Sequence, residues 1–477
     1  MAADPIQRTE QGRENLYRAL PSVNELLLAP EMQKVIQAHG HDRVVAAIRD
    51  RLVAIRAEIA GTELSGEQLE DQINSVARCV AETLECGPEY SLRPIINATG
   101  VILHTNLGRA PLSEAALAHV VEVARGYCNL EFDLESGERS RRDVHVERLV
   151  LRVLGIAEDE WPRCGVVVVN NCAAATFLAL NALADEREVV VSRGELVEIG
   201  GGFRIPEILE KSGAVLREVG TTNRTRGADY ERAVSEGTAL LLRVHQSNFS
   251  IEGFVERPSL RELVQLAKVA GVTLFEDQGT GLVSGLEETG VTYQPTLRDS
   301  IAAGVDLVAA SGDKLLGGPQ CGLLVGRADL IARIQKNPLL RAFRVDKLTY
   351  AALEATLFEY IGASGEALPL MRMLHTPTEE IEKRCHTIAD SIRSARVSIA
   401  VVPVHSVVGG GTAPSARLKS HAVSVRHTQL GAGEVLKKLR SCKPPMIGRI
   451  AEDAVLLDLR TVPAHLDETV VRLIGQL

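Results

Sequence analysis

A lysine and a pair of carboxylates each follow a short apolar segment of this sequence, at positions where such side chains can do chemistry. Lys314 comes after the segment 306–311 and before the Gly-Gly-Pro turn at 317–319. Flanking strands and glycines would bury its amine, and burial lowers the pKa of a lysine, as an imine-forming nucleophile requires; an ordinary surface lysine is the alternative. Glu276 and Asp277 end another apolar segment. A carboxylate at a buried strand end needs a partner, either a capped backbone or a cationic ligand.

A third apolar segment, 165–170, runs into a helix start that is rich in small residues. Asn171 and Cys172 are followed there by Ala173 and Ala174. Small residues at a helix N-terminus let an anion approach the free backbone N–H groups, where the helix dipole also favours it. Taken alone, helix packing explains this start better.

Together, the three segment ends supply what pyridoxal phosphate requires. Ligands of open α/β sheets bind at the carboxyl ends of the strands, so the three groups are expected to form one site. The phosphate of this cofactor takes a helix N-terminus, its pyridinium nitrogen takes an aspartate and its aldehyde takes a lysine. The sequence therefore predicts a pyridoxal phosphate site with Asp277 and Lys314, and no metal site.

Seven short apolar runs position these groups, and helix-like segments separate nearly all of them. Continuous apolar strands that alternate with helices predict a mostly parallel sheet covered on both faces. We therefore expect a large α/β domain over residues 91–360. The seven runs are 165–170, 188–192, 214–219, 239–244, 272–277, 306–311 and 321–326.

The two flanking parts of the chain have different patterns. Residues 1–90 repeat apolar residues at helical spacing and predict a helical domain without a catalytic motif. Residues 361–477 predict a small α/β domain. Within it, the stretch 417–449 carries eight Lys or Arg residues and one acid, a pattern typical of a solvated face or, alternatively, of contact with an anionic partner such as RNA.

Composition excludes several classes of protein. The 477 residues carry 53 Lys plus Arg against 62 Asp plus Glu, a net charge of −9, which excludes a uniformly basic nucleic-acid binder but not a local basic patch, and we expect no DNA partner. Only 3% of residues are aromatic, too few for base-stacking platforms. No apolar run reaches the roughly 18 residues of a membrane helix. Without a secretory signal or paired cysteines, we expect a cytoplasmic protein with reduced thiols and no membrane partner.

Ten ordered motifs resemble those of one family. They are RPIINATGVILHTNLGRAPLS (93–113), SGERSRRDVHVE (136–147), NNCAAAT (170–176), RGELVEIGGGFRIPEI (193–208), VGTTNRT (219–225), RVHQSNFSIEGF (243–254), EDQGTG (276–281), SGDKLLGGPQCG (311–322), RAFRVDK (341–347) and PPMIGRI (444–450). From about residue 20 to the C-terminus, the chain resembles the bacterial L-seryl-tRNA(Sec) selenium transferases, or selenocysteine synthases.

This resemblance implies a fold-type-I pyridoxal phosphate enzyme with a large seven-stranded sheet domain, a small C-terminal domain and an N-terminal helical domain. It implies conversion of seryl-tRNA(Sec) to selenocysteinyl-tRNA(Sec), through loss of water to an aminoacrylyl-tRNA and addition of selenium from selenophosphate. It also implies a homo-oligomer, a pentamer of dimers, whose N-terminal domain grips the tRNA. The candidate basic contacts there are Arg43, Arg49, Arg51 and Arg56.

The resemblance also implies roles for individual residues. Lys314 matches the Schiff-base lysine, Asp313 a neighbour needed for activity, and Asp277 the partner of the ring nitrogen. The other cofactor contacts would be Asn171, Cys172, Ala173, Ala174 and His245. Selenophosphate would be held by Arg109, Arg341 and Arg344. Arg341 and Arg344 are three residues apart, so we expect them to share a helix face, and guanidinium forks suit a tetrahedral oxyanion.

Three stretches depart from the family pattern, and two other functions remain open. HQSNF (245–249) stands where HTSNY is usual, EDQGTG where EDLGSG is usual, and Cys172 where an asparagine is usual. One alternative is a pyridoxal phosphate lyase of an amino acid or amino sugar acid, which would react with free serine rather than a charged tRNA. The other is a non-catalytic RNA-binding paralogue, which would be colourless when purified.

Overall fold

The computed structural model describes residues 15–477, apart from 62–64, 86–89, 201, 290, 292–293, 364 and 414–415. The chain forms two compact units, Met1–Pro94 and Ile95–Leu477. Among the described residues, no helix has the length and apolar character needed to cross a bilayer.

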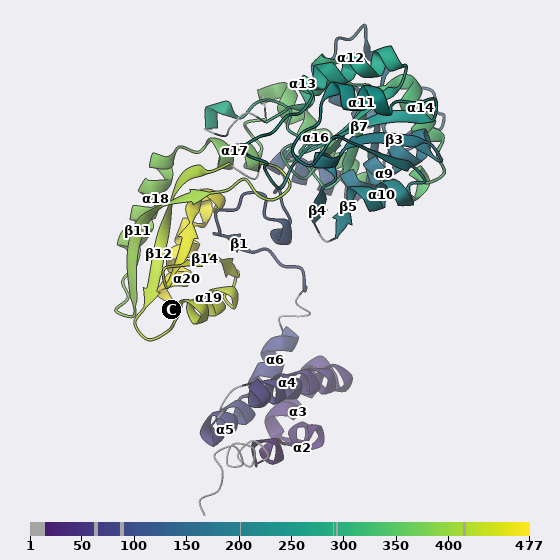
Figure 1. Ribbon diagram of the computed structural model, residues 1–477. Helices are drawn as coiled ribbons and strands as arrows, with labels where there is room; N and C mark the ends of the chain where they lie inside the picture. Colours follow the sequence, from purple (N-terminus) through teal and green to yellow (C-terminus); the bar gives the residue numbers. More distant parts are fainter. Residues whose placement is uncertain are drawn as a thin grey trace, which may run out of the picture. The chain divides into compact units, whose positions relative to one another are not determined.

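The first unit is helical, as predicted. Its helices, labelled in Figure 1, are α2 (Val23–Leu28), α3 (Pro30–His39), α4 (His41–Gly61), α5 (Gly66–Asn74) and α6 (Val76–Glu85). Capping boxes begin two of them, with Ser22 and Glu25 at α2 and Ser65 and Gln68 at α5. The long helix α4 buries one apolar stripe, and this stripe packs with α3, α5 and α6 into a separate core.

The second unit contains the predicted seven-stranded sheet. Its strands are β2 (Cys164–Val169), β3 (Glu188–Ser192), β6 (Val215–Val219), β7 (Thr238–Val244), β8 (Thr273–Gly279), β9 (Leu307–Ser311) and β10 (Gly322–Arg327). Their order is β2-β10-β9-β8-β7-β3-β6. Only β10 runs antiparallel to its two neighbours, and the pairs from β9 to β6 are all parallel. All seven predicted apolar runs are strands of this sheet.

Helices cover both faces of the seven-stranded sheet (Figure 1). One face carries α9 (Cys172–Ala184), α10 (Ile205–Lys211) and α14 (Ala328–Lys336). The other carries α8 (Val144–Val153), α11 (Gly227–Ala233), α12 (Leu260–Ala270), α13 (Leu297–Ala303) and α16 (Lys347–Ala363), with α7 (Glu114–Ala124) packed on α16. Alternate residues of β2 enter different cores, Val166 on the α8 side and Val167 on the α9 side. Burial on both faces explains why the strands are continuous apolar runs.

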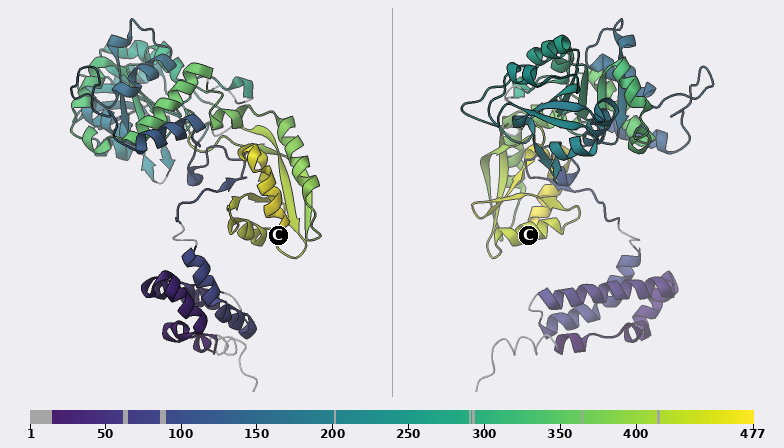
Figure 2. Two further views of the ribbon diagram at one scale, coloured as in Figure 1. Left: turned by 180° about the vertical axis from the view of Figure 1, so that it is seen from behind. Right: turned by 45° about the vertical axis from the view of Figure 1, so that its right-hand side comes forward.

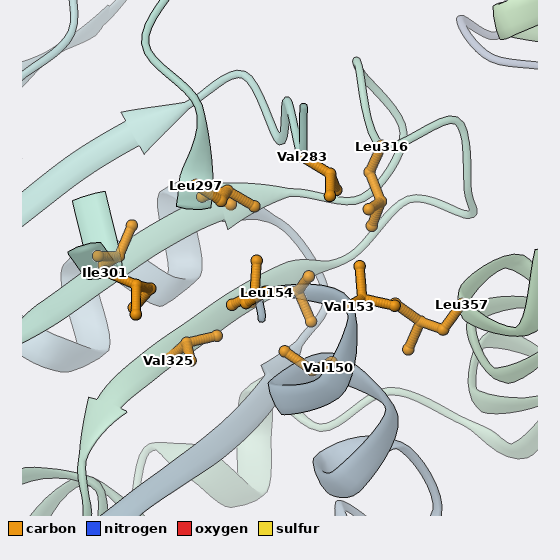
Figure 3. Close-up of a pocket in the computed structure, with 12 residues that line it drawn as sticks. Val150, Val153, Leu154, Val283, Leu297, Ile301, Leu316, Val325 and Leu357 are labelled. Atoms are coloured by element: carbon orange, nitrogen blue, oxygen red, sulfur yellow. The ribbon is translucent and has the colours of Figure 1, made fainter. Parts of the chain in front are cut away.

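The α8 side of the sheet anchors the loop that carries Lys314. Figure 3 shows Leu316 among the apolar residues that line one small gap, to which α8 contributes Val150 and Val153 and α16 contributes Leu357. The cluster leaves a gap of only about 10 Å³, room for at most about one water molecule. Because this packing is tight, the backbone just after Lys314 is held in a fixed place.

A four-stranded antiparallel sheet forms the C-terminal part. Its strands are β11 (Val397–Ser406), β12 (Leu418–His427), β15 (Ala454–Asp458) and β14 (Arg449–Ala451), in that order. Helices α18 (Thr378–Ser391), α19 (Ala432–Arg440) and α20 (Asp467–Gly475) share its core, and Figure 2 shows α20 beside these strands. The short helices α15 (Leu340–Phe343) and α17 (Pro369–His375) lie between the two sheets in sequence.

The segment that enters the second unit pairs with C-terminal residues before it reaches the large sheet. Strand β1 (Ile96–Asn97) runs parallel to β13 (Met446–Ile447), and Val101 forms a bridge with Val407. Residues 96–101 therefore contact the C-terminal part, although the predicted large domain begins at residue 91. The division into domains 1–90, 91–360 and 361–477 stays a prediction.

Candidate active site

Lys314 is buried, as its sequence neighbourhood indicates, with 7% of its surface exposed. It lies in the loop between β9 and β10. The N–H of Gly312 donates to the carbonyl of Cys321 at 2.9 Å, and the N–H of Leu315 donates to the carbonyl of Thr280 at 2.8 Å. The first bond closes the lysine loop on itself, and the second ties it to the loop that follows β8. The side chain of Lys314 is therefore directed by backbone bonds on both sides.

Asp277 lies near the end of β8, and side chains of helix α9 contact its carboxylate oxygens. Thr176 Oγ1 donates to one carboxylate oxygen at 3.1 Å, and Cys172 Sγ lies 3.6 Å from the other. Desolvation raises the pKa of the Asp277 carboxyl, whereas the Thr176 bond and the charge of Lys314 act to lower it. Desolvation and then the Asp277 charge raise the pKa of the Cys172 thiol well above its usual value, so the thiol stays a hydrogen-bond donor.

The start of α9 presents backbone donors beside this carboxylate. Asn171 caps the helix, because its Oδ1 accepts from the N–H of Ala174 at 2.8 Å. Cys172 and Ala173 line the same cavity as Lys314. First-turn N–H groups lack intrahelical partners, so those of Cys172 and Ala173 can receive an anion. The N–H of Ala174 is instead taken by its cap.

These groups surround one cavity of about 450 Å³. Six of the seven residues predicted to contact the cofactor line it, namely Asn171, Cys172, Ala173, His245, Asp277 and Lys314, and Ala174 does not. Ser247, Gln278 and Gln320 also line it, although sequence reasoning did not single them out. The fit to pyridoxal phosphate rests on the donor set, since an anion cradle, a buried carboxylate and a buried amine border one space.

Arg109 and Asp313 form an ion pair at the same cavity. Arg109 Nη1 lies 2.7 Å from Asp313 Oδ2, and the Asp313 side chain is 8% exposed. The backbone of Arg109 has φ 61°, in the left-handed region that costs energy for residues other than glycine. The fold holds Arg109 in this conformation through the bond from its N–H to the carbonyl of His104, at 3.1 Å.

Arg341 and Arg344 occupy different surroundings from Arg109. Neither residue lines the lysine cavity. Helix α15 ends at Phe343, and Arg344 has an extended conformation with ψ 138°, so the expected shared helix face is wrong. Arg344 forms a bridge with Val169, at the end of β2, and its Nη1 lies 3.2 Å from Glu131 Oε1. The helical expectation failed because three-residue spacing matters only where the helix continues.

His245 closes the cavity from the end of β7. Burial lowers the pKa of His245 to about 4, although a hydrogen bond with the backbone of Thr412 acts to raise it. Its Nε2 is buried without a hydrogen-bond partner in the part of the chain that the structure describes. A neutral ring with one free nitrogen can hydrogen-bond a ligand in the cavity.

The C-terminal part also reaches Lys314, which sequence reasoning missed. Gly411 has φ 80°, and a Cβ built there would lie 3.2 Å from Lys314 Nζ. The bridge between Val101 and Val407 brings this glycine segment to the site. The run of three glycines at 409–411, directly after a predicted strand, was the available indication of a close backbone approach.

The sequence motifs and this geometry agree with comparisons to known proteins. A family model described as L-seryl-tRNA selenium transferase matches residues 95–463, and one described as selenocysteine synthase N terminal matches residues 17–56. The chain belongs to the L-seryl-tRNA selenium transferase family. The membership confirms the predicted family, enzyme class and pyridoxal phosphate cofactor.

Curated relatives match over almost the whole chain. The L-seryl-tRNA(Sec) selenium transferase of Aquifex aeolicus is 42% identical over 439 residues, covering 91% of this chain and 94% of the relative. That of Moorella thermoacetica is 43% identical over 467 residues, covering 97% of each. Among solved structures, a D-glucosaminate-6-phosphate ammonia-lyase matches with a TM-score of 0.55 and 22% identity, over 81% of this chain and 95% of its own. At that identity the likeness concerns the fold, which is the predicted fold type I.

Proposed function

We propose that this protein converts L-seryl-tRNA(Sec) to L-selenocysteinyl-tRNA(Sec) with selenophosphate as the selenium donor. The observation that carries the proposal is the meeting of Lys314, Asp277 and the α9 N-terminus at one cavity, in a member of this transferase family. The β-hydroxyl of the seryl group leaves as water and selenium takes its place, while water cleaves the P–Se bond of selenophosphate and phosphate is released.

Pyridoxal phosphate, when bound, supplies an electron sink for the substrate Cα. The carboxylate of Asp277 would hold the proton on the ring nitrogen, and Thr176 orients that carboxylate through its 3.1 Å bond. The N–H groups of Cys172 and Ala173 receive the phosphate at the start of α9. Lys314 Nζ, a buried amine that lines the cavity, removes the proton from the substrate Cα.

The arginine and aspartate beside the lysine supply the second half of the reaction. Arg109 presents a guanidinium whose pair with Asp313 fixes its direction toward the cavity, and so it binds the anionic selenium donor. Lys314 or Asp313 supplies the proton with which the β-hydroxyl leaves as water. We also assign Arg341 and Arg344 to selenophosphate binding, as contacts outside the cavity lining. Arg344 lies beside the end of β2, where it forms a bridge with Val169.

The N-terminal helical unit is the proposed tRNA contact. Arg43, Arg49, Arg51 and Arg56 all lie on α4, and these are the candidate phosphate contacts. A pentamer of dimers and a cytoplasmic location complete the proposal.

The visible absorption spectrum of the purified protein tests this function. We expect a cofactor band that shifts on addition of seryl-tRNA(Sec) and does not shift with free serine. A band that shifts with free serine would move the assignment to a small-molecule lyase. Absence of any band, even after adding pyridoxal phosphate, would overturn the site.

A Lys314→Ala variant provides the matching chemical test. We expect it to lose conversion of seryl-tRNA(Sec), and wild-type turnover by this variant would contradict the proposed role of the amine. Arg333→Gln is the control, because Arg333 is an exposed residue of α14 that contacts the carbonyl of Ala182 and lies outside the cavity lining.

A further inference from the structure

A second cavity opens on the face of the sheet opposite α9. Val244 and Asp277 are partners in register, and so are Arg243 and Glu276 one residue earlier. Because side chains alternate along a strand, the two pairs face opposite sides. Asp277 contacts α9, whereas the Arg243 pair borders a cavity of about 380 Å³ next to α12 and α13.

Three arginines line this second cavity. Arg243 lies in its wall, and its Nη1 is 2.8 Å from Glu195. Arg257 donates to the neutral side chain of Gln246 and, within the described ranges of the chain, forms no ion pair with a carboxylate. Arg257 and Arg261 are both exposed residues, and the carboxylate of Asp299 also lines the cavity. Partial desolvation and the repulsion of Arg243 lower the pKa of Arg257, so a bound anion would stabilise it.

Glu276 borders the cavity at its most buried side. Glu276 is 4% exposed, and its Oε2 has no hydrogen-bond partner among the described residues. A buried polar atom without a partner points to a missing ligand group. Desolvation raises the pKa of this carboxyl, whereas a hydrogen bond with Ser300 and the charge of Arg243 act to lower it. The unpartnered oxygen of Glu276 and the three arginines therefore border one space.

We propose that this arginine pocket (Arg243, Arg257, Arg261 and Glu276) binds a phosphate-type oxyanion. Guanidinium forks match a tetrahedral oxyanion. The cavity volume accommodates a phosphate together with part of an ester substituent. The ligand is either a free phosphate or a phosphodiester of the RNA strand, and the second source rests on the proposed function.

The arginine pocket shares a wall with the lysine cavity. Val244 and His245 line both spaces. Gln246 follows them, accepts from Arg257 and donates to the carbonyl of Gly194 at 2.6 Å. An oxyanion in the arginine pocket therefore lies behind the histidine that faces Lys314, and it fixes the position of that wall.

Protection from an arginine reagent tests the pocket directly. The full-length cofactor-bound protein is treated with phenylglyoxal in potassium phosphate, or in potassium chloride at the same ionic strength, and modification is read for each arginine by peptide mass spectrometry. We expect phosphate to slow modification of Arg257 at least fivefold in a saturable manner, and to leave the exposed Arg333 unchanged. Equal rates at Arg257 in the two salts would overturn the proposal.

Two further measurements separate the source of the anion from folding effects. Arg257→Gln should abolish the protection of Arg261, whereas Arg333→Gln should retain it; retention in the first variant would overturn the shared pocket. The trinucleotide CpCpA is then used as the second probe. Protection by both phosphate and CpCpA assigns an RNA phosphodiester, and protection by phosphate alone assigns a free phosphate. Since no arm measures turnover, failure of the proposed function would leave the phosphate result standing.

Discussion

Glu276 and Asp277 are consecutive carboxylates on one strand, and the structure gives them opposite surroundings. Asp277 faces α9, where Thr176 and Cys172 contact both of its oxygens. Glu276 faces arginines and keeps one buried oxygen without a partner in the described structure. Burial raises the pKa of both carboxyls. The difference teaches that a carboxylate becomes a fixed anionic partner only where neutral donors orient it.

The largest expected effect comes from removing the charge of Asp277. Asp277→Asn should lower turnover about 100–1,000-fold, as loss of one preorganised electrostatic contact does. Glu276→Gln should keep pyridoxal phosphate affinity within about threefold, because Glu276 faces the other side of the sheet. Turnover of seryl-tRNA(Sec) and cofactor titration by absorbance measure the two effects. A matching loss of cofactor affinity in both variants would remove the contrast between the carboxylates.

The same substitution has an opposite effect on the cofactor-free protein. Since the folded-state pKa of Asp277 is raised, its burial costs stability, and that cost grows as the pH rises through this pKa. Asp277→Asn should therefore unfold at higher urea concentration than the wild type at pH 8, with a smaller difference at pH 4.

The next largest effect is the contribution of His245 to the pH dependence of stability. Its pKa falls from 6.5 to about 4 on folding, so unfolding takes up a proton between these values. Stability is lost as the pH falls from 6.5 to about 4, by up to ~3 kcal/mol. His245→Asn should remove this part of the acid sensitivity in urea titrations at pH 7.5 and pH 4.5. An unchanged pH slope in the variant would show that the ring is not held neutral.

The third effect concerns the ion pair of the lysine cavity. Arg109 is paired with a carboxylate, that of Asp313, whereas Arg257 in the arginine pocket donates to the neutral Gln246. Arg109→Ala should lower the free energy of unfolding by about 2 kcal/mol, because it leaves the buried Asp313 unpaired. The double variant Arg109→Ala/Asp313→Asn should recover most of that loss. Urea unfolding of the four proteins completes the cycle, and strictly additive losses would mean that the pair is not coupled.

The smallest effect concerns the glycine segment 409–411, which lies next to Lys314. Gly411→Ala should lower the free energy of unfolding by about 1 kcal/mol, since a left-handed backbone is costly for alanine. It should also weaken cofactor binding, because the new methyl group meets Lys314 Nζ. Gly410→Ala is the matched control, as nothing lies within 4 Å of a Cβ there. Equal behaviour of the two variants would contradict the close approach.

The parts of the site that the sequence predicted are those fixed by local order. Parallel strands end at one edge of a sheet, so Asp277, Lys314 and the α9 start were bound to meet once the seven runs were recognised. The partner of Arg344 could not be predicted, because Glu131 lies in a loop more than 200 residues away in sequence. Gly411 reaches Lys314 through pairing between strands at opposite ends of the second unit, which periodicity does not encode.

That pairing has a consequence for synthesis of the chain. Strand β1, at residues 96–97, needs β13, at residues 446–447, as its partner. At roughly 5–20 residues per second, a ribosome takes about 20–70 s to make the intervening chain. During that time the buried side chains of Ile96, Ile102 and Leu103 have no C-terminal neighbours. Until residues 446–447 are made, β1 therefore lacks its partner strand, and a chain that ends earlier cannot form this pairing.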